Sequence, residues 1–332
     1  MNCANTPAAV TDGAVRERAG RRGQTVAMRE LVVLGTSSQV PTRARNHNGY
    51  FLRWDGDGLL FDPGEGTQRQ MIHAGVASSQ VTRICLTHVH GDHCFGLPGV
   101  LARMAVDQVT HPVHLHYPAS GEETVRALTG LAGAGPDLRW HPHGGAGDVA
   151  DGLEVAPLRH RVETYGYRVR EPDGRTLLPD LLTAAGITGL DVGRLQREGQ
   201  VGGVRLADVS VPRRGQSFAL VMDTAVCDGA RRLAEGTDVV VMESTFADEE
   251  AGLAAEYGHL TAGQAGALAG EAGAGLLVLT HFSSRYADVA PLREQAQARA
   301  GATRVVAAAD LDRYNFPRRR ELRRRTSPGP GA

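Results

Sequence analysis

The residues with the clearest chemical meaning form the motif HVHGDH at positions 88–93, directly after the apolar stretch 84–86. Its first two histidines are two positions apart, so a strand that is still extended there points both imidazoles to one side. The glycine permits a sharp turn, after which the aspartate and the third histidine face a neighbouring position. Burying three imidazoles and a carboxylate for packing alone is costly, which favours a metal site over a histidine-rich surface loop. The candidate ligands are His88, His90, Asp92 and His93.

Three further candidate ligands follow predicted strands elsewhere in the chain. The apolar stretches that begin at residues 153, 217 and 276 lead to His160, Asp223 and His281. If these strand ends converge on one edge of a β-sandwich, all seven side chains meet there. Asp223 is the natural bridge between two ions, because a carboxylate has two oxygens. One ion would be held by His88, His90 and His160, and the second by Asp92, His93 and His281.

This ligand set indicates which ions and which reaction to expect. Imidazole and carboxylate ligands suit Zn²⁺, and the carboxylates also admit Mn²⁺ or Fe²⁺. Two ions about 3.5–4 Å apart stabilise the attacking and leaving oxygens of a phosphoryl displacement and activate water near neutral pH. The spacing therefore predicts a two-metal hydrolase.

The elements that position these ligands follow from the hydrophobic pattern. Strands are expected at 29–35, 51–54, 58–62, 83–88, 113–117, 153–160, 165–170, 217–223, 238–245, 275–281 and 304–310. Helices are expected near 65–75, 121–133, 261–273 and 288–299. Short strands come in pairs in each half of the chain, with helices between some of them. This mixture predicts an α+β architecture of two β-sheets with helices on their outer faces.

Three segments depart from this pattern. Residues 1–27 are polar and without periodicity, which predicts a disordered N-terminal extension before a main domain at 28–316. The pattern weakens again at 163–214, which is expected to be an insertion that projects from the core. Residues 317–332 form a basic tail, expected to be disordered and solvated, because a charge run of this kind is usually only surface.

Composition narrows the class of protein further. The 332 residues include 36 basic and 37 acidic ones, a net charge of -1, and 42% hydrophobic residues, as in ordinary soluble globular proteins. All the basic residues are arginine, which we attribute to genome composition. No apolar run reaches the roughly 18–20 residues of a membrane-spanning helix. No secretory signal is present, and the four cysteines form no CxxC pair. We therefore expect a cytoplasmic protein with free thiols and no membrane partner.

The combined motifs resemble the metallo-β-lactamase superfamily and, within it, the short bacterial form of the ribonuclease Z family. They are LGTSSQVPTRARN (34–46), FDPGEGTQRQ (61–70), THVHGDHCFGLPG (87–99), RHRVETYGY (159–167), MDT (222–224), EST (243–245), YGHLTAGQA (257–265) and LTHFSSRY (279–286). The resemblance implies a four-layer αββα sandwich that binds two Zn²⁺ per subunit and forms a homodimer. It also implies an endoribonuclease that removes the 3′ trailer from precursor tRNA by metal-hydroxide attack and leaves a 3′-hydroxyl.

The resemblance also assigns catalytic roles. Asp92 would serve both as a metal ligand and as the acceptor of a proton from the attacking water. His259 matches the family histidine proposed to protonate the leaving 3′ oxygen of the tRNA. Glu243 would orient His259, as outer groups commonly orient catalytic histidines.

Candidate RNA contacts lie in three places. Arg43 and Arg45 belong to the PTRARN loop, which resembles the family segment near the acceptor end of tRNA, and arginines there can engage phosphates. Ser283 and Arg285 follow His281 and are candidates for binding the scissile phosphate or the terminal nucleotide. The insertion at 163–214 corresponds to the flexible arm, or exosite, with which the family grips tRNA, and Arg194 is a candidate contact there. This insertion lacks the Gly-Pro element common in the family.

Two other functions stay open at this level. Another metallo-β-lactamase-fold phosphodiesterase, or an arylsulfatase-like hydrolase of small substrates, would share the metal ligands but not the PTRARN loop or the arm. An RNA-binding module could keep metals only for folding, although a structural zinc site needs neither a bridging carboxylate nor a proton donor. The remaining seven histidines are expected to be structural or solvated.

Overall fold

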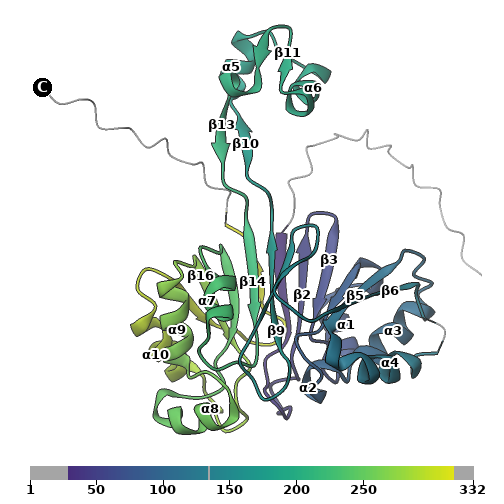
Figure 1. The fold of residues 1–332 in the computed structure, drawn as a ribbon, viewed down its shortest axis with the longest axis vertical. Helices are drawn as coiled ribbons and strands as arrows, with labels where there is room; N and C mark the ends of the chain where they lie inside the picture. Colours follow the sequence, from purple (N-terminus) through teal and green to yellow (C-terminus); the bar gives the residue numbers. More distant parts are fainter. Residues whose placement is uncertain (1–28, 134, 318–332) are drawn as a thin grey trace, which may run out of the picture.

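The computed structural model describes residues 29–133 and 135–317 (Figure 1). The predicted extension at 1–27 lies outside these residues, as does the basic tail except for Pro317. Within the described ranges, no helix combines the length and the hydrophobicity that crossing a bilayer requires.

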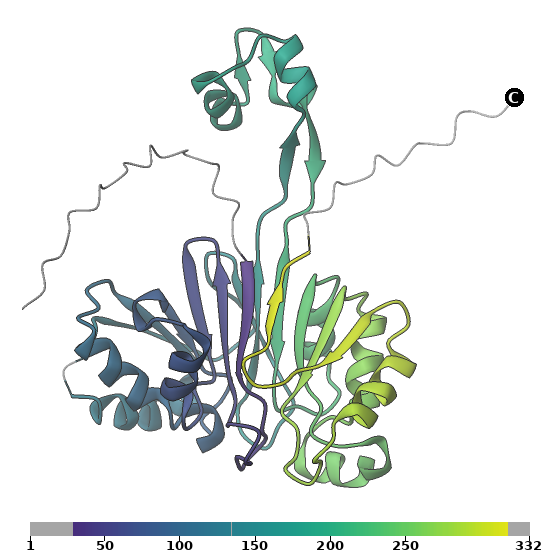
Figure 2. The same cartoon turned by 180° about the vertical axis from the view of Figure 1, so that it is seen from behind.

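The first of two seven-stranded sheets has the order β18-β1-β2-β3-β4-β5-β6. Its strands are β1 (Arg29–Gly35), β2 (Gly49–Trp54), β3 (Asp57–Phe61), β4 (Arg83–Cys85), β5 (Val113–Pro118), β6 (Leu138–His143) and β18 (Arg313–Asn315). The β1–β3 meander is antiparallel, whereas β3 to β6 run parallel. β18 pairs with β1, which brings the end of the described chain back to its start (Figure 2).

The second sheet has the order β17-β16-β15-β14-β9-β8-β7. Its strands are β7 (Gly147–Ala150), β8 (Leu153–Pro157), β9 (Tyr165–Arg170), β14 (Ser217–Val221), β15 (Val239–Glu243), β16 (Leu276–Thr280) and β17 (Arg304–Ala307). β14 to β17 are parallel, and β7 to β9 are antiparallel. Parallel strands that are buried on both faces are nearly continuous apolar runs, as Val239–Glu243 illustrates with the sequence VVVME, in which only the last residue is polar.

Three apolar layers hold the sheets and helices together. One lies between the two sheets and includes Tyr167 and Phe218. The others join each sheet to its own helices, which flank the sandwich in Figure 1. On the first sheet these are α1 (Thr67–Ala74), α3 (Leu97–Val106) and α4 (Glu122–Gly130), and on the second α7 (Asp228–Ala234), α9 (Ala262–Glu271) and α10 (Ala290–Arg299). The predicted αββα sandwich is therefore confirmed.

One edge of the sandwich collects the ends of β3, β4, β14, β15 and β16, because parallel strands finish at the same edge. Two short helices, α2 (Gly91–Cys94) and α8 (Ala251–Tyr257), lie at this edge, at the bottom of Figure 1. The loops that follow these strands are therefore neighbours in space, although they are far apart in the sequence.

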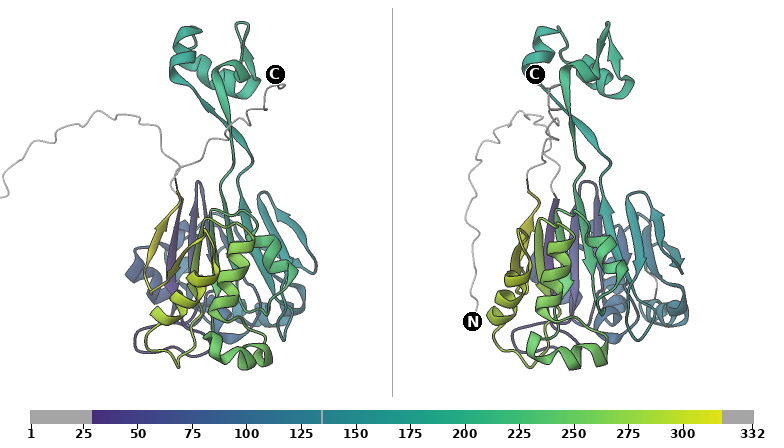
Figure 3. Two further views of the ribbon diagram at one scale, coloured as in Figure 1. Left: turned by 90° about the vertical axis from the view of Figure 1, so that its left-hand side faces the viewer. Right: turned by 60° about the vertical axis from the view of Figure 1, so that its left-hand side comes forward.

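A projecting unit, residues 174–213, stands at the opposite end of the sandwich (Figures 1 and 3). Its stalk is the antiparallel pair β10 (Gly174–Leu177) and β13 (Ser210–Arg213). The stalk carries α5 (Pro179–Ala184), α6 (Leu190–Glu198), β11 (Gln200–Val201) and β12 (Val204–Arg205), packed on a small core of Leu182, Ile187, Leu195, Val201 and Val209. The wider range 163–214 marked out from the sequence also contains β9, which belongs to the second sheet.

Glu171 ties the base of the projecting unit to the sandwich. Its carboxylate accepts hydrogen bonds from Arg29 of β1, at 2.8 Å, and from Arg213 of β13, at 2.9 Å. Arg29 is almost fully buried, and its guanidinium lies 4.0 Å from the centre of the Trp54 ring. Buried charges paired in this way hold a fixed geometry, so the stalk leaves the sandwich in a defined direction.

Candidate metal centre

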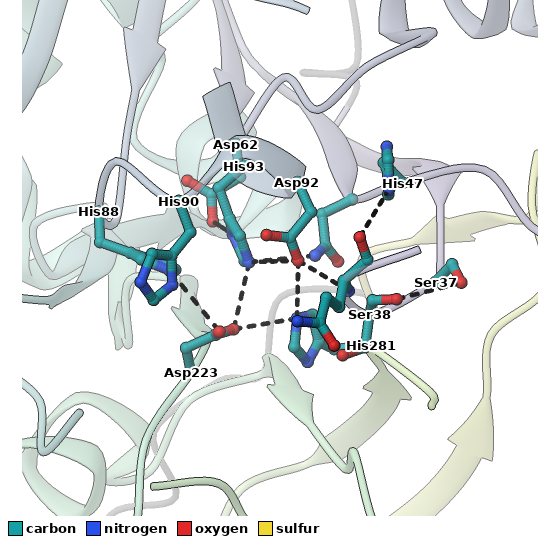
Figure 4. Close-up of polar contacts among 12 residues, drawn as sticks. Ser37, Ser38, His47, Asp62, His88, His90, Asp92, His93, Asp223 and His281 are labelled. Carbon is teal, nitrogen blue, oxygen red and sulfur yellow. Dashed lines mark hydrogen bonds and ion pairs between the residues drawn. The ribbon is translucent and has the colours of Figure 1, made fainter. Parts of the chain in front are cut away.

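The seven predicted ligands all lie at the edge where the strands end, and Figure 4 labels all of them except His160. His88 and His90 occupy the loop after β4, and Asp92 and His93 lie on α2. His160, Asp223 and His281 come shortly after β8, β14 and β16. The structure therefore brings together all the side chains that the strand-end argument selected.

Asp223 lies between two groups of these side chains. Its Oδ2 is 3.6 Å from His88 Nε2 and 3.7 Å from His160 Nε2. Its Oδ1 is 3.3 Å from His93 Nε2 and 3.1 Å from His281 Nε2. Each carboxylate oxygen thus faces a different pair of imidazoles, which is the arrangement expected of a bridging ligand.

The ligand atoms fall into the two sets that the sequence predicts. One candidate atom each from His88, His90, His160 and Asp223 lies within 4.8 Å of the others, and the same holds for Asp92, His93 and His281. Several of these atoms are buried without a hydrogen-bond partner, namely His160 Nε2, His281 Nε2 and Asp223 Oδ1. Buried polar atoms rarely stay unpartnered, so this donor set fits divalent metal ions.

The outer nitrogens of the histidines are held by the protein, which aims their Nε2 atoms inward. Asp62 Oδ2 accepts from His93 Nδ1 at 2.9 Å and from the Thr87 hydroxyl at 2.8 Å. The same hydroxyl lies 3.0 Å from His88 Nδ1. Contacts of this kind fix the tautomer and the ring orientation of metal-binding histidines.

A similar set of hydrogen bonds holds the outer nitrogen of His281, the histidine that follows β16 of the second sheet. The Thr245 hydroxyl donates to Glu243 Oε2 at 2.7 Å and lies 2.8 Å from His281 Nδ1. Sequence reasoning selected Glu243 but missed Asp62, Thr87 and Thr245. Asp62 directly follows the apolar strand β3, so the rule that found His281 after β16 applies to it too.

Backbone geometry turns three of these carboxylate and imidazole groups toward the edge. Asp62, Asp223 and His281 have φ values of 43°, 28° and 58°, in the left-handed region that residues other than glycine rarely adopt. Such conformations persist only where the surroundings enforce them, and they are concentrated at functional sites.

Electrostatics favours cation binding at this centre. Burial would raise the pKa of the Asp223 carboxyl, but the charges of the surrounding histidines hold it well below its usual range. Burial holds the pKa of His88 well below its usual value, so this imidazole is neutral. Burial opposes a charge on His93 as well, yet the nearby carboxylates raise its pKa well above the usual value. The carboxylates therefore favour a positive charge at this centre, and a metal ion bound there would take the place of the proton on His93.

His259 and Glu243 form a pair beside the seven ligands. His259 Nδ1 lies 2.9 Å from Glu243 Oε1, and Glu243 is fully buried. Burial would lower the pKa of His259, but the charge and hydrogen bond of Glu243 outweigh it and raise the pKa to about 9. A protonated His259 in this position can donate a proton toward the metal centre.

The metal centre opens into a cleft of about 620 Å³. Its lining includes the catalytic candidates Asp92 and His259, and it also includes Phe95, which directly follows α2, and Tyr257 of α8. The cleft is accessible to solvent and lined mostly by polar residues, so it can admit a charged, extended substrate.

Comparison with known proteins identifies the family. Ribonuclease Z of Streptomyces coelicolor is 54% identical over 302 residues, which is 89% of this chain and 100% of that protein. Ribonuclease Z of Nocardia farcinica is 54% identical over 306 residues, again 89% of this chain and 100% of its own length. This chain belongs to the ribonuclease Z family. It is therefore a hydrolytic nuclease, and the predicted family is confirmed.

A family model and two solved structures agree on the fold. The model of the metallo-beta-lactamase superfamily matches residues 42–197. The crystal structure of human tRNase Z, short form, superposes with a TM-score of 0.61 at 23% identity and covers 87% of this chain and 99% of its own. The metallo-beta-lactamase fold protein YhfI from Bacillus subtilis gives a TM-score of 0.64 at 18% identity, covering 86% and 98%. At these identities the two structures establish the fold alone.

The predicted substrate contacts of this ribonuclease Z family member lie in different surroundings. Ser283 and Arg285 line the cleft, and Arg285 is also paired with Glu250. Arg43 is exposed on the loop nearby. Arg45 instead is half-buried and donates from Nη2 to the backbone carbonyls of Ser283, at 3.3 Å, and Tyr286, at 2.5 Å.

Arg194 lies far from the metal centre. It is on α6 of the projecting unit and pairs with Asp191 and Glu198 on the same helix. Both pairs are exposed, so they are weak and leave the guanidinium accessible.

Proposed function

We propose that this chain removes the 3′ trailer from precursor tRNA by hydrolysing a phosphodiester and leaves a 3′-hydroxyl. The observation that carries the proposal is the position of Asp223, whose two oxygens face two ligand groups. Such a centre suits two divalent ions per subunit, and its ligands favour Zn²⁺, with Mn²⁺ or Fe²⁺ as alternatives. Its relatives named ribonuclease Z support the choice of tRNA as substrate.

The chain's own residues supply the acid and the base. Metal ions bound at this centre contribute Lewis-acid chemistry, which acidifies water and offsets charge on phosphate oxygens. Asp92 accepts the proton of the attacking water. Its Oδ2 accepts the Gln39 N–H at 2.9 Å and lies 3.5 Å from His281 Nε2, so the carboxylate is held in place. His259, kept charged by Glu243, donates a proton to the leaving 3′ oxygen.

We further propose that the chain works as a homodimer on precursor tRNA. The projecting unit and the metal centre stand at opposite ends of one chain, so one copy presents them in opposite directions (Figure 3). In a dimer, the projecting unit of one copy can hold the tRNA whose 3′ end enters the cleft of the other. Arg43, Ser283 and Arg285 would contact the RNA near the cut, and Arg194 would contact it at the projecting unit.

One experiment tests the reaction. Purified protein is incubated with a precursor tRNA that carries a 3′ trailer, with and without a chelator, and beside an Asp92→Asn variant. The expected result is cleavage at the trailer junction, with a 3′-hydroxyl on the tRNA, and loss of cleavage in both controls. Metal analysis of the purified protein should give two ions per chain, and light scattering should give the mass of two chains.

Other outcomes would overturn the proposal. Hydrolysis of aryl esters or small phosphodiesters without trailer cleavage would favour a different hydrolase of this fold. Binding of precursor tRNA without any hydrolysis would favour an RNA-binding module that uses metal only for folding.

A further inference from the structure

Exposed aromatic side chains are concentrated at the cleft. Among the residues that the structure describes, only Phe95 and Tyr257 are exposed aromatics, at 59% and 38% of their surface, and both line the cleft. Exposing an aromatic ring to water does not stabilise the fold. The position of such a ring next to a reaction centre therefore indicates a role in binding.

Tyr257 belongs to a layered wall on the α8 side. Its ring is nearly parallel to that of the buried Phe246, with 6.4 Å between centroids and 15° between planes. The guanidinium of Arg161 lies 5.4 Å from the centre of the Tyr257 ring, and that of Arg285 lies 5.1 Å from Phe246. Arg161 is exposed and makes no ion pair with any carboxylate among the described residues. The wall thus combines an accessible ring with a cation that is available for a phosphate.

Phe95, which directly follows α2, forms a second wall of the cleft. A Cβ added at Gly91 would lie only 2.4 Å from the Phe95 ring, so the ring packs directly on the backbone beside Asp92. Helices α2 and α8 come from different halves of the chain and stand apart at the edge of the sandwich (Figure 1). Phe95 and Tyr257 both line the cleft into which the metal centre opens.

We propose that these two rings stack on the two nucleobases that flank the scissile phosphate. The inference rests on the proposed cleavage of precursor tRNA and adds how the RNA is gripped. His259 fixes the orientation of the RNA strand in the cleft, because it protonates the leaving oxygen. That oxygen belongs to the last retained nucleotide. Phe246 of the Tyr257 wall lies 6.0 Å from His259, centroid to centroid. The base of the last retained nucleotide therefore stacks on Tyr257 with its phosphate on Arg161, and the first base of the trailer stacks on Phe95.

Stacking of this kind suits the substrate class. Every nucleobase presents a flat face, so an aromatic ring holds single-stranded RNA without selecting a sequence. Single-stranded ends, rather than helices, are the parts of RNA that proteins splay onto aromatic side chains. An enzyme that accepts precursors with different terminal bases and different trailers needs a grip of this sort.

The test combines protein variants with altered RNA. Three precursor tRNAs are compared: one intact, one without a base at the last retained nucleotide, and one without a base at the first trailer nucleotide. The protein variants are Tyr257→Ala and Phe95→Ala, and Leu131→Ala serves as a control at an exposed site outside the cleft. Phe95→Leu is a second variant that keeps apolar volume against Gly91, and metal content is measured for each protein.

On the intact precursor, each aromatic variant should lose about 5- to 150-fold in kcat/KM, the range expected for one stacked base. On RNA that lacks the last retained base, Tyr257→Ala should have the same kcat/KM as the unaltered protein. On RNA that lacks the first trailer base, both Phe95 variants should have the same kcat/KM as the unaltered protein. Equal losses on all three RNAs, or a reversed pairing of rings and bases, would overturn the inference. Failure of the unaltered protein to cleave the intact precursor would instead overturn the proposed function.

Discussion

His259 Nδ1 lies 2.9 Å from a carboxylate oxygen of Glu243, and that carboxylate is fully buried. Glu243 also accepts the backbone N–H of Thr224 and the hydroxyl of Thr245, each at 2.7 Å. The Thr245 backbone N–H donates to it as well, at 3.3 Å. With four donors around it, the carboxylate stays charged without access to solvent, and it stabilises a proton on the imidazole. The pair therefore controls the pH range in which His259 can act as an acid.

Glu243→Gln should move the alkaline limb of kcat to lower pH. Catalysis requires protonated His259, so kcat falls as pH rises through the pKa of His259, which Glu243 raises to about 9 despite burial. Without the negative charge that pKa falls, and the loss of activity begins at lower pH. The measurement is a pH profile of kcat with saturating precursor tRNA. An unmoved limb would show that another group titrates there.

Asp62→Asn should weaken metal binding by about 10- to 100-fold, the usual cost of losing a carboxylate that orients a metal-binding histidine. Asp62 is fully buried and accepts from Thr87 N–H at 2.7 Å as well as from His93. Zinc affinity is measured by competition with a chelator of known strength. The exposed Asp151→Asn provides the matched control. Equal zinc affinity in all three proteins would contradict the role of Asp62.

Arg45 and Arg43 should respond differently to alanine. Arg45→Ala removes a donor from the carbonyls of Ser283 and Tyr286, which costs about 1–3 kcal/mol of stability if the carbonyls stay buried. It should also slow hydrolysis of both precursor tRNA and bis(p-nitrophenyl) phosphate, because the segment after His281 loses its anchor. Arg43→Ala should affect precursor tRNA alone. If Arg45→Ala spares the small substrate, Arg45 acts on RNA directly.

His116→Leu should reduce the loss of stability in acid. His116 is fully buried on β5, its ring stacks on His141 with 4.6 Å between centroids, and neither nitrogen has a hydrogen-bond partner. Burial, together with His141, lowers the pKa of His116 to about 3. The unfolded chain takes up a proton below pH 6.5 and the folded chain only near 3, so stability falls as pH falls between these values.

This site contributes at most about 1.4 kcal/mol per pH unit in that window. Chemical unfolding at several pH values compares the variant with the unaltered protein and with His73→Gln, which removes an exposed imidazole. The difference in unfolding free energy between variant and parent should grow in favour of the variant below pH 6.5. A constant difference would show that His116 is charged in the folded state.

Removal of the projecting unit, with residues 173 and 214 joined by a short linker, should separate two activities. Cleavage of precursor tRNA should fall strongly, while hydrolysis of bis(p-nitrophenyl) phosphate should remain, because the seven ligands lie at the other end of the sandwich. Glu171 and Arg29 stay in place at the base. Equal loss of both activities would mean that the unit supports the fold instead of the substrate.

The ligands could be predicted because strand ends carry a clear signal. An apolar strand followed by a histidine or an aspartate located His160, Asp223 and His281, and the sandwich then placed them together. The same rule applied to β3 would have located Asp62. The hydroxyl relays through Thr87 and Thr245 could not be predicted, because threonine next to a strand end is ordinary and its partner is set by tertiary structure.

Several elements carry too weak a pattern to be predicted. Helix α6 has only one buried residue, Leu195, and contains Gly193, so it lacks the apolar stripe of a packed helix. Helix α8 likewise buries only Ala254. The core of the projecting unit stabilises α6, and the loops around the cleft stabilise α8. The structural role of Arg45 could not be predicted either, because an arginine in a polar loop is usually exposed. Its contacts with the carbonyls of Ser283 and Tyr286 depend on the tertiary structure.

The stalk of the projecting unit has a consequence for where the RNA is cut. β10 and β13 are paired in register from Gly174↔Arg213 to Leu177↔Ser210, so the stalk behaves as a spacer of fixed length. Each residue added to both strands would lengthen it by about 3.3 Å, and pairs of residues would keep the same faces outward. In the proposed dimer, a spacer of fixed length sets the distance along the tRNA between the projecting unit and the cleavage site. The cutting position then does not depend on the nucleotide sequence at the junction.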